Sequence, residues 1–143
     1  MRYLLATDGS PSSIRAAEWV SRHLPGNGKS ELFLVFVFPI PPATAFYTGI
    51  VSFPEDPSDE RVRRVAQRVF DATRPALEGF QDAIHEVLLA GNPAQQIIEF
   101  AETQRVDLMV TGTRGHSPST ELCLGSTSNA VLHRALCPVL IVR

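Results

Sequence analysis

The sequence predicts an α/β fold, a three-layer sandwich in which helices cover both faces of a five-stranded parallel sheet. Short apolar runs alternate with longer amphipathic segments along the chain, as expected when strands and helices follow one another. The most apolar run, residues 31–38, shows no polar alternation, which is typical of a strand buried on both faces of a parallel sheet. We therefore expect right-handed crossovers between the strands and a single domain over residues 1–143.

The N-terminal segment predicts a strand followed by a helix. Residues 3–6 form a short apolar run that ends at Thr7-Asp8-Gly9. Ser10 is a favoured N-cap residue, and Pro11 suits the first turn of a helix. Pro25-Gly26 then ends this helix, because neither residue readily continues a helical segment.

The second strand, residues 31–38, leads into residues 39–57, where five prolines indicate a long loop. Ser58 or Asp59 begins the second helix. The expected apolar face of this helix consists of Val62, Val65, Ala66, Val69 and Leu77. Most of its arginines lie elsewhere around the helix, and we interpret them as a solvated face. These arginines are Arg61, Arg63, Arg64 and Arg68.

The C-terminal half continues the alternation. The remaining strands are expected at residues 84–89, 106–110 and 139–142, with helices beginning at Gly91-Asn92-Pro93 and covering residues 126–134. In an open parallel sheet, ligands bind outside the carboxyl ends of the strands, where the strand order reverses. The first strand ends at Asp8 and the fourth at Gly112, so we expect a site between them.

Composition and residue pattern exclude several classes of function. The formal net charge is −2 and the pI about 6.1, so no nucleic acid partner is expected. No run approaches the roughly 20 apolar residues that span a bilayer, and we expect a cytoplasmic protein. Cys123 and Cys137 form no Cys-x-x-Cys pair, and the histidines share no pattern with a nucleophile. The sequence therefore predicts no metal-ligating and no catalytic residue.

The segment after the fourth strand carries the strongest functional signal. A glycine at Gly112 or Gly115 lets the backbone turn with positive φ or approach a ligand closely. Gly125 precedes a helix whose first amides, at Ser126 and Thr127, lack partners within the helix and favour an anion. No lysine follows the glycines, so the segment is not a Walker-type P-loop. The alternative is that the three glycines only serve tight turns, with Ser126 as an ordinary N-cap.

The same residues match a family motif. Gly112, Gly115, Gly125 and Ser126 fit G-x-x-G-x9-G-[ST] at every position, and further matches are LLATDGSPSS, LVFVF, AGNPAQQIIEFA and CPVLIVR. Over essentially the whole chain, most weakly across residues 40–80, the sequence resembles the ATP-binding branch of the universal stress protein family. The resemblance implies a Rossmann-like fold of the adenine nucleotide alpha hydrolase type, with strand order 3-2-1-4-5. It also implies ATP, or ADP or AMP, as ligand, with Mg²⁺ possible through the phosphates.

By this resemblance, Asp8 lies at the nucleoside end of the pocket and accepts a hydrogen bond from the adenine amino group or a ribose hydroxyl. Val37 offers backbone groups to adenine, and the glycine segment holds the ribose and the phosphates. The alternative for Asp8 is a capping residue beside Gly9-Ser10. The residues expected to bind the nucleotide are Ala6, Thr7, Asp8, Val37, Thr111, Gly112, Arg114, Gly115, Gly125, Ser126, Thr127 and Ser128.

The resemblance, together with the missing lysine and general base, favours binding over catalysis. We expect an ATP-binding regulatory protein that acts as a homodimer, paired through the apolar edge strand Val139–Val142. A slow ATPase or self-phosphorylating enzyme, with Mg²⁺ on the phosphates and Ser126 as an acceptor, is one alternative. A nucleotide-free protein-interaction module is the other, and the intact glycine motif argues against it.

Overall fold

The structure, a computed structural model, describes residues 1–24, 26, 28–40, 57–114 and 124–143. Most of the predicted long loop, residues 41–56, lies outside them. Among the described residues, no helix combines the length and the apolar composition needed to cross a membrane. Along the chain the elements are β1 (Arg2–Ala6), α1 (Pro11–His23), β2 (Glu31–Pro39), α2 (Glu60–Thr73), the 3-10 helix η2 (Arg74–Leu77), β3 (Ala83–Gly91), α3 (Pro93–Gln104), β4 (Leu108–Gly112), α4 (Ser126–Arg134) and β5 (Val139–Val142).

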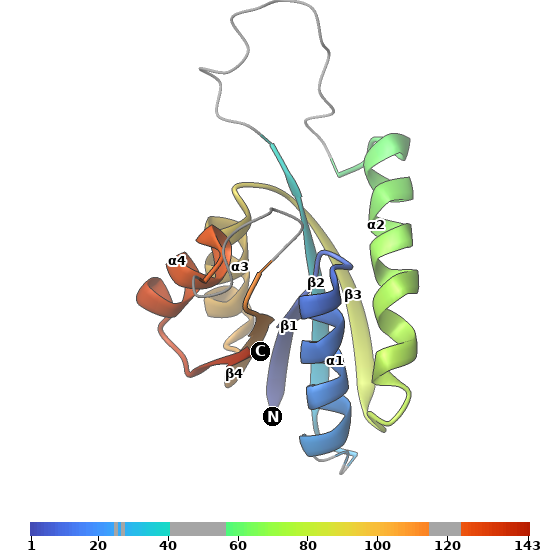
Figure 1. The fold of residues 1–143 in the computed structure, drawn as a ribbon, viewed down its shortest axis with the longest axis vertical. Helices are drawn as coiled ribbons and strands as arrows, with labels where there is room; N and C mark the ends of the chain where they lie inside the picture. Colours follow the sequence, from blue (N-terminus) through green and yellow to red (C-terminus); the bar gives the residue numbers. More distant parts are fainter. Residues whose placement is uncertain (25, 27, 41–56, 115–123) are drawn as a thin grey trace, which may run out of the picture.

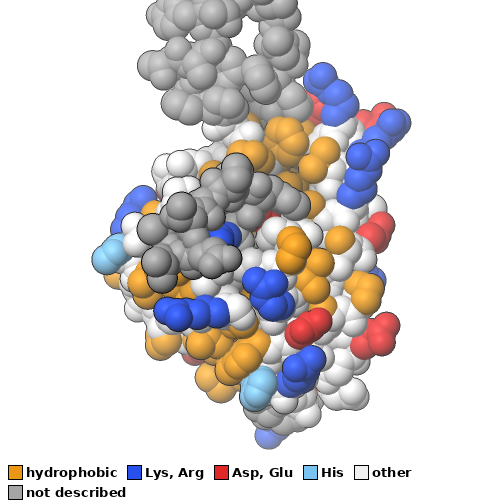
Figure 2. Space-filling view, viewed as in Figure 1, with side chains coloured by type: hydrophobic (Ala, Val, Ile, Leu, Met, Phe, Trp, Pro, Cys, Tyr) orange, Lys and Arg blue, Asp and Glu red, His pale blue; other side chains and the backbone are white. Residues whose placement is uncertain are grey.

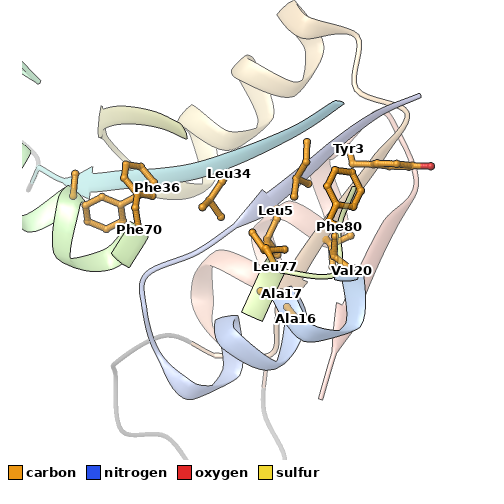
Figure 3. Packing of buried hydrophobic residues seen from close by; sticks show 13 residues of the cluster. Tyr3, Leu5, Ala16, Ala17, Val20, Leu34, Phe36, Phe70, Leu77 and Phe80 are labelled. Carbon is orange, nitrogen blue, oxygen red and sulfur yellow. The ribbon is translucent and has the colours of Figure 1, made fainter. Parts of the chain in front are cut away.

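The five strands form one parallel sheet in the order β3-β2-β1-β4-β5, so the predicted fold class and strand order are confirmed. Figure 1 shows α1 and α2 on one side of the sheet and α3 and α4 on the other. Because successive strand residues point to opposite faces, Leu5 is buried with α1 and α2, whereas Leu4 is buried with α3. In the hydrophobic cluster that contains Leu5, the rings of Tyr3 and Phe80 meet edge to face, with ring centroids 6.4 Å apart (Figure 3).

The fourth strand begins at Leu108 rather than at Val106, so its predicted start is wrong. The amide of Val106 donates to the carbonyl of Ala101 at 2.9 Å and so belongs to the turn that ends α3. Arg105 closes that helix in the left-handed conformation, with φ of 52°. Val106 is nevertheless buried in the core, and its burial explains why the hydrophobic pattern placed the strand too early.

The second helix begins where predicted, with Asp59 as its N-cap, but its apolar face belongs only partly to the core. Val62 and Ala66 are buried, as expected, whereas Val65 is 38% exposed. Figure 1 shows that the N-terminal part of α2 extends past the carboxyl ends of β1 and β4, although β2 reaches about as far as the helix. Val65, in this part of the helix, is only partly covered and can border a ligand site.

The arginines of α2 form a solvated face, as predicted. Arg61, Arg63, Arg64 and Arg68 are all exposed, and Figure 2 shows basic side chains along the outer side of this helix. The side chain of Arg61 bonds to the Asp59 carboxylate at 2.8 Å, and this hydrogen bond lowers the pKa of Asp59. Exposed pairs of this kind contribute little to stability, because water screens them.

Candidate functional site

A large cavity lies at the carboxyl ends of the strands, where the strand order reverses around β1. Its volume is about 690 Å³, and small-molecule sites typically measure about 300–1,000 Å³. Every predicted binding residue that the structure describes lines this cavity, whereas Gly115 lies outside the described residues. These lining residues are Ala6, Thr7, Asp8, Val37, Thr111, Gly112, Arg114, Gly125, Ser126, Thr127 and Ser128.

The side of the cavity next to β2 is apolar. Val37 and Pro39 come from β2, Val65 and Val69 from α2, and Ile97 from α3. Both helices pack on β2, one on each face of the sheet, so they wall this end of the cavity from two sides. Apart from Val37, sequence reasoning did not assign these residues to the site. For α2, the sequence feature that could have indicated the wall is the apolar pair Val65 and Val69, which lie one helical turn apart.

Asp8 borders the cavity just after the central strand β1. Its Oδ1 accepts a hydrogen bond from the amide of Ser10 at 3.0 Å, so the predicted alternative of a capping residue describes a real contact. This bond occupies one of the roughly four acceptor sites that a carboxylate carries on its two oxygens. The two readings of Asp8 are therefore compatible, because the residue both shapes the turn and lines the cavity.

Three of the predicted residues use their hydroxyls within the protein. Thr7 Oγ1 lies within hydrogen-bond distance of two other hydroxyls, 2.8 Å from Thr73 and 3.1 Å from Ser13. The hydroxyls of Ser128 and Thr111 both donate to the carbonyl of Gly112, at 2.8 and 3.2 Å. These side chains shape the cavity by holding its backbone, in addition to lining it.

Gly112 is a glycine because α1 passes close to it. A Cβ at this position would lie 2.5 Å from the Oγ of Ser12 and 2.6 Å from its backbone carbon and oxygen. The expected positive φ is absent: among the described glycines only Gly9, Gly28 and Gly91 have one. The close approach at Gly112 is therefore between two segments of the chain, and it brings the N-terminus of α1 against the cavity.

The start of α4 supplies the polar end of the cavity. Gly125 is the N-cap of this helix, so the predicted alternative with Ser126 as an ordinary N-cap is wrong. Glycine has no side chain to bond the first-turn amides, and Ser126, Thr127 and Ser128 all line the cavity. The amide of Gly125 donates to the carbonyl of Thr113 at 2.7 Å, which ties the helix start to the end of β4. Backbone amides and the helix dipole at this point favour a bound anion.

A second, smaller cavity of about 270 Å³ lies between α3, β4 and the segment before β5. Ile98, Met109, Leu136 and Cys137 are among its lining residues. Cys137 is half-buried, and burial raises the pKa of its thiol. The thiol therefore stays protonated at neutral pH and is a poor nucleophile. Cys123 lies outside the described residues.

The chain matches the universal stress protein family model over residues 1–143. It is 38% identical over 142 residues to a universal stress protein of Thermus aquaticus, with 98% of this chain and 96% of that protein covered. It is 34% identical over 148 residues to universal stress protein YxiE of Bacillus subtilis, with 99% and 98% covered.

Solved structures share the fold. A universal stress protein of Archaeoglobus fulgidus in complex with dAMP has a TM-score of 0.68 at 16% identity, covering 100% of this chain and 98% of that one. An Arabidopsis thaliana family member with AMP bound has a TM-score of 0.64 at 19% identity, covering 99% and 90%. A universal stress protein in complex with cAMP has a TM-score of 0.67 at 23% identity, covering 100% and 96%. With the family model and two relatives matched along nearly the whole sequence, this chain belongs to the universal stress protein family.

Proposed function

We propose that the protein binds an adenine nucleotide, ATP or its products ADP and AMP, in the large cavity, as a member of the ATP-binding branch of its family. The observation that carries this proposal is the order of the surfaces along the sheet edge. An apolar wall lies at β2, the carboxylate of Asp8 follows at β1, and an amide-rich turn and helix start lie at β4 and α4. A nucleotide presents its base, ribose and phosphates in the same order.

Each surface suits the part of the ligand assigned to it. The apolar side chains of Val37, Val65 and Val69 exclude water from the two faces of a base. Asp8 accepts hydrogen bonds from ribose hydroxyls or the base amino group, and it would repel the phosphates if they lay beside it. The phosphates then lie at the start of α4, near Arg114, where amides and the helix dipole favour negative charge. Mg²⁺, when present, would offset charge on the phosphates.

The ligands of structural relatives support the ligand class. Three proteins with this fold were solved with AMP, dAMP or cAMP, each of which carries adenine. We further propose that nucleotide occupancy, rather than turnover, is the functional event, and that the protein has a regulatory role in the stress response in the cytoplasm.

The substitution Asp8→Asn tests the site directly. The asparagine retains an Oδ1 that accepts from the Ser10 amide, so the turn keeps its hydrogen bond. The negative charge is lost, and a hydrogen bond to a charged group contributes about 1.5–3 kcal/mol. We expect the affinity for ATP to fall by about 10- to 100-fold. Isothermal titration of nucleotide-free protein with ATP, ADP and AMP measures this change and ranks the three ligands.

A matched control is Asp107→Asn. Asp107 also accepts a backbone amide, that of Arg2 at 2.7 Å, but it precedes β4 at the opposite end of the sheet. The affinity of the Asp107→Asn protein for ATP is expected to equal that of the wild type. The proposal fails if the wild type shows no heat of binding with any of the three nucleotides and mass spectrometry finds none in freshly purified protein.

We also propose a homodimer paired through β5. Within the described part of the chain, this strand has a neighbour, β4, on one side only. The carbonyls of Pro138 and Val142 accept hydrogen bonds from the β4 side, at 3.0 and 3.1 Å. Since alternate residues of a parallel strand bond to the same neighbour, the backbone N–H and C=O of Ile141 point to the open edge. Leu136, just before the strand, is 83% exposed, and Figure 2 shows hydrophobic side chains gathered on this face.

The substitution Ile141→Pro is expected to convert the dimer to a monomer. Proline removes an N–H that faces the open edge, while the bonds from β5 to β4 stay in place. Light scattering at micromolar concentration should give twice the chain mass of 15.7 kDa for the wild type and the single mass for the variant. Circular dichroism checks that the variant is folded. A wild-type protein that scatters as a monomer would contradict the dimer.

A further inference from the structure

Four buried hydroxyls are connected by hydrogen bonds, and two of the residues that carry them, Thr7 and Ser13, line the cavity. Thr7 follows β1, Ser10 caps α1, Ser13 lies within α1, and Thr73 is the last residue of α2. Their exposed fractions are 6%, 1%, 3% and 0%. Burial of a hydroxyl is unfavourable unless it is hydrogen-bonded, and in the described part of the chain every buried side-chain nitrogen or oxygen has a partner. The four groups therefore form a network of defined geometry.

Thr7 is the centre of this network. Its Oγ1 lies 2.8 Å from the Oγ1 of Thr73 and 3.1 Å from the Oγ of Ser13. The amide of Gly9 donates to the same Oγ1 at 3.1 Å. Because Gly9 directly follows Asp8, the Thr7 hydroxyl connects the turn that carries Asp8 to both α1 and α2.

The direction of the central bond follows from the number of hydrogens available. Each hydroxyl has one hydrogen to donate and two lone pairs to accept with. The hydroxyl of Thr73 donates to the carbonyl of Val69, and that of Ser13 donates to the carbonyl of Ser10, both at 2.9 Å. With those hydrogens used, Thr7 is the donor, and Thr73 is its nearer acceptor. Thr73 thus bonds to Thr7, the residue after β1, and to its own helix at the same time.

The same turn meets α2 at a second point. Gly9 has a φ of +75°, and a Cβ built on it would lie 3.5 Å from the Cα of Val69. Val69 also lines the cavity, and its carbonyl is the one that accepts from Thr73. A shift of α2 relative to the turn would therefore change the spacing between Asp8 and the apolar wall.

We propose that Thr73 is a positioning residue, whose hydroxyl holds the turn carrying Asp8 at a fixed distance from α2 and so sets the width of the cavity. The part of this proposal that concerns ligand affinity rests on the proposed nucleotide function; the part that concerns the turn does not. Without the Thr73 hydroxyl, Thr7 still has Ser13 as an acceptor, so no buried hydrogen loses its partner. What is lost is the hydrogen bond that joins Thr7, after β1, to α2.

The test compares Thr73→Val, which keeps the shape and removes the hydroxyl, with Thr73→Ser, which keeps the hydroxyl. Two quantities are measured on each protein: the hydrogen exchange rate of the Gly9 amide without ligand, by NMR, and the dissociation constant for ATP. For Thr73→Val we expect exchange about tenfold faster and ATP binding about three- to tenfold weaker. For Thr73→Ser we expect both values within about twofold of the wild type.

Val20→Ala is the control for general destabilisation. Val20 lies in α1 and is fully buried in the hydrophobic cluster that also contains Phe70 of α2. It is not part of the hydroxyl network. Its variant is expected to lower the melting temperature more than Thr73→Val does, with a smaller change at Gly9. The proposal is overturned if Thr73→Val leaves Gly9 exchange at the wild-type rate, or if Thr73→Ser fails to restore it. If the wild type binds no ATP, the nucleotide function fails, and the Gly9 exchange rates alone decide the role of Thr73.

Discussion

The substitution Gly112→Ala is expected to lower the free energy of unfolding by about 3 kcal/mol, although it adds a single methyl group. The new Cβ would lie 2.6 Å from the backbone carbon and oxygen of Ser12. A flexible side chain moves away from such a contact at little cost, but backbone atoms in the first turn of α1 do not. That turn is fixed by its N-cap, since the Ser10 hydroxyl accepts from the Ser13 amide at 3.3 Å. Urea denaturation of both proteins measures the difference.

Gly79→Ala is the matched control for this prediction. Its Cβ would also meet a serine closely, at 2.6 Å, but the nearest atom is the side-chain Oγ of Ser21, and the backbone oxygen lies at 3.4 Å. Rotation of that hydroxyl relieves the contact, so we expect a loss of about 1 kcal/mol, mainly from its hydrogen bond to the Gly79 amide. Equal losses for the two variants would show that the position of Ser12 does not explain Gly112.

Elements that depend on local chemistry could be predicted from the sequence. The bounds of α4 and β5, Ser126–Arg134 and Val139–Val142, agree with the prediction. Ser10 and Asp59 act as N-caps where expected. A cap bonds to an amide two or three residues away, so its effect is visible within a short window of sequence. The fold class follows from the alternation of such elements.

Features that depend on contacts between distant segments could not be predicted. The reason for Gly112 lies at Ser12, at the other end of the chain. The role of Thr73 depends on Thr7, which α1 and β2 separate from it in sequence. The hydrophobicity of Val106 predicts a strand residue, and only the hydrogen bond from its amide to the carbonyl of Ala101 assigns it to the helix end. No window of sequence contains both partners of the first two contacts.

The candidate site, too, could be predicted from the sequence only in part. The polar half, from Asp8 and the segment around Gly112, follows strand ends and a motif, and both are visible in sequence. The apolar wall of α2 was expected to pack in the core, because Val65 and Val69 have the spacing of a buried helix face. Whether such a face meets the sheet or a cavity depends on which distant segments pack against the helix, and the sequence of the helix does not contain that information.

The centre of the cavity offers a way to test its use without changing any polar group. Ala6 is the last residue of β1, pairs with Val35 and Thr111 on either side, and is half-buried at the cavity. Its side chain lies on the face covered by α3, where it packs against the core cluster that includes Val37. A larger side chain here extends into space that the core does not fill.

The substitution Ala6→Phe is therefore expected to abolish nucleotide binding while the protein stays folded. A phenyl ring placed between the apolar wall and the helix start occupies the volume that the nucleoside needs. We expect the affinity for ATP to fall by about 100-fold or more, which equals about 2.7 kcal/mol, with the circular dichroism spectrum unchanged. Ala83→Phe, at the exposed start of β3 and the opposite end of the sheet, controls for the added ring and should bind like the wild type. Retained binding by a folded Ala6→Phe protein would mean that the nucleotide lies outside this cavity.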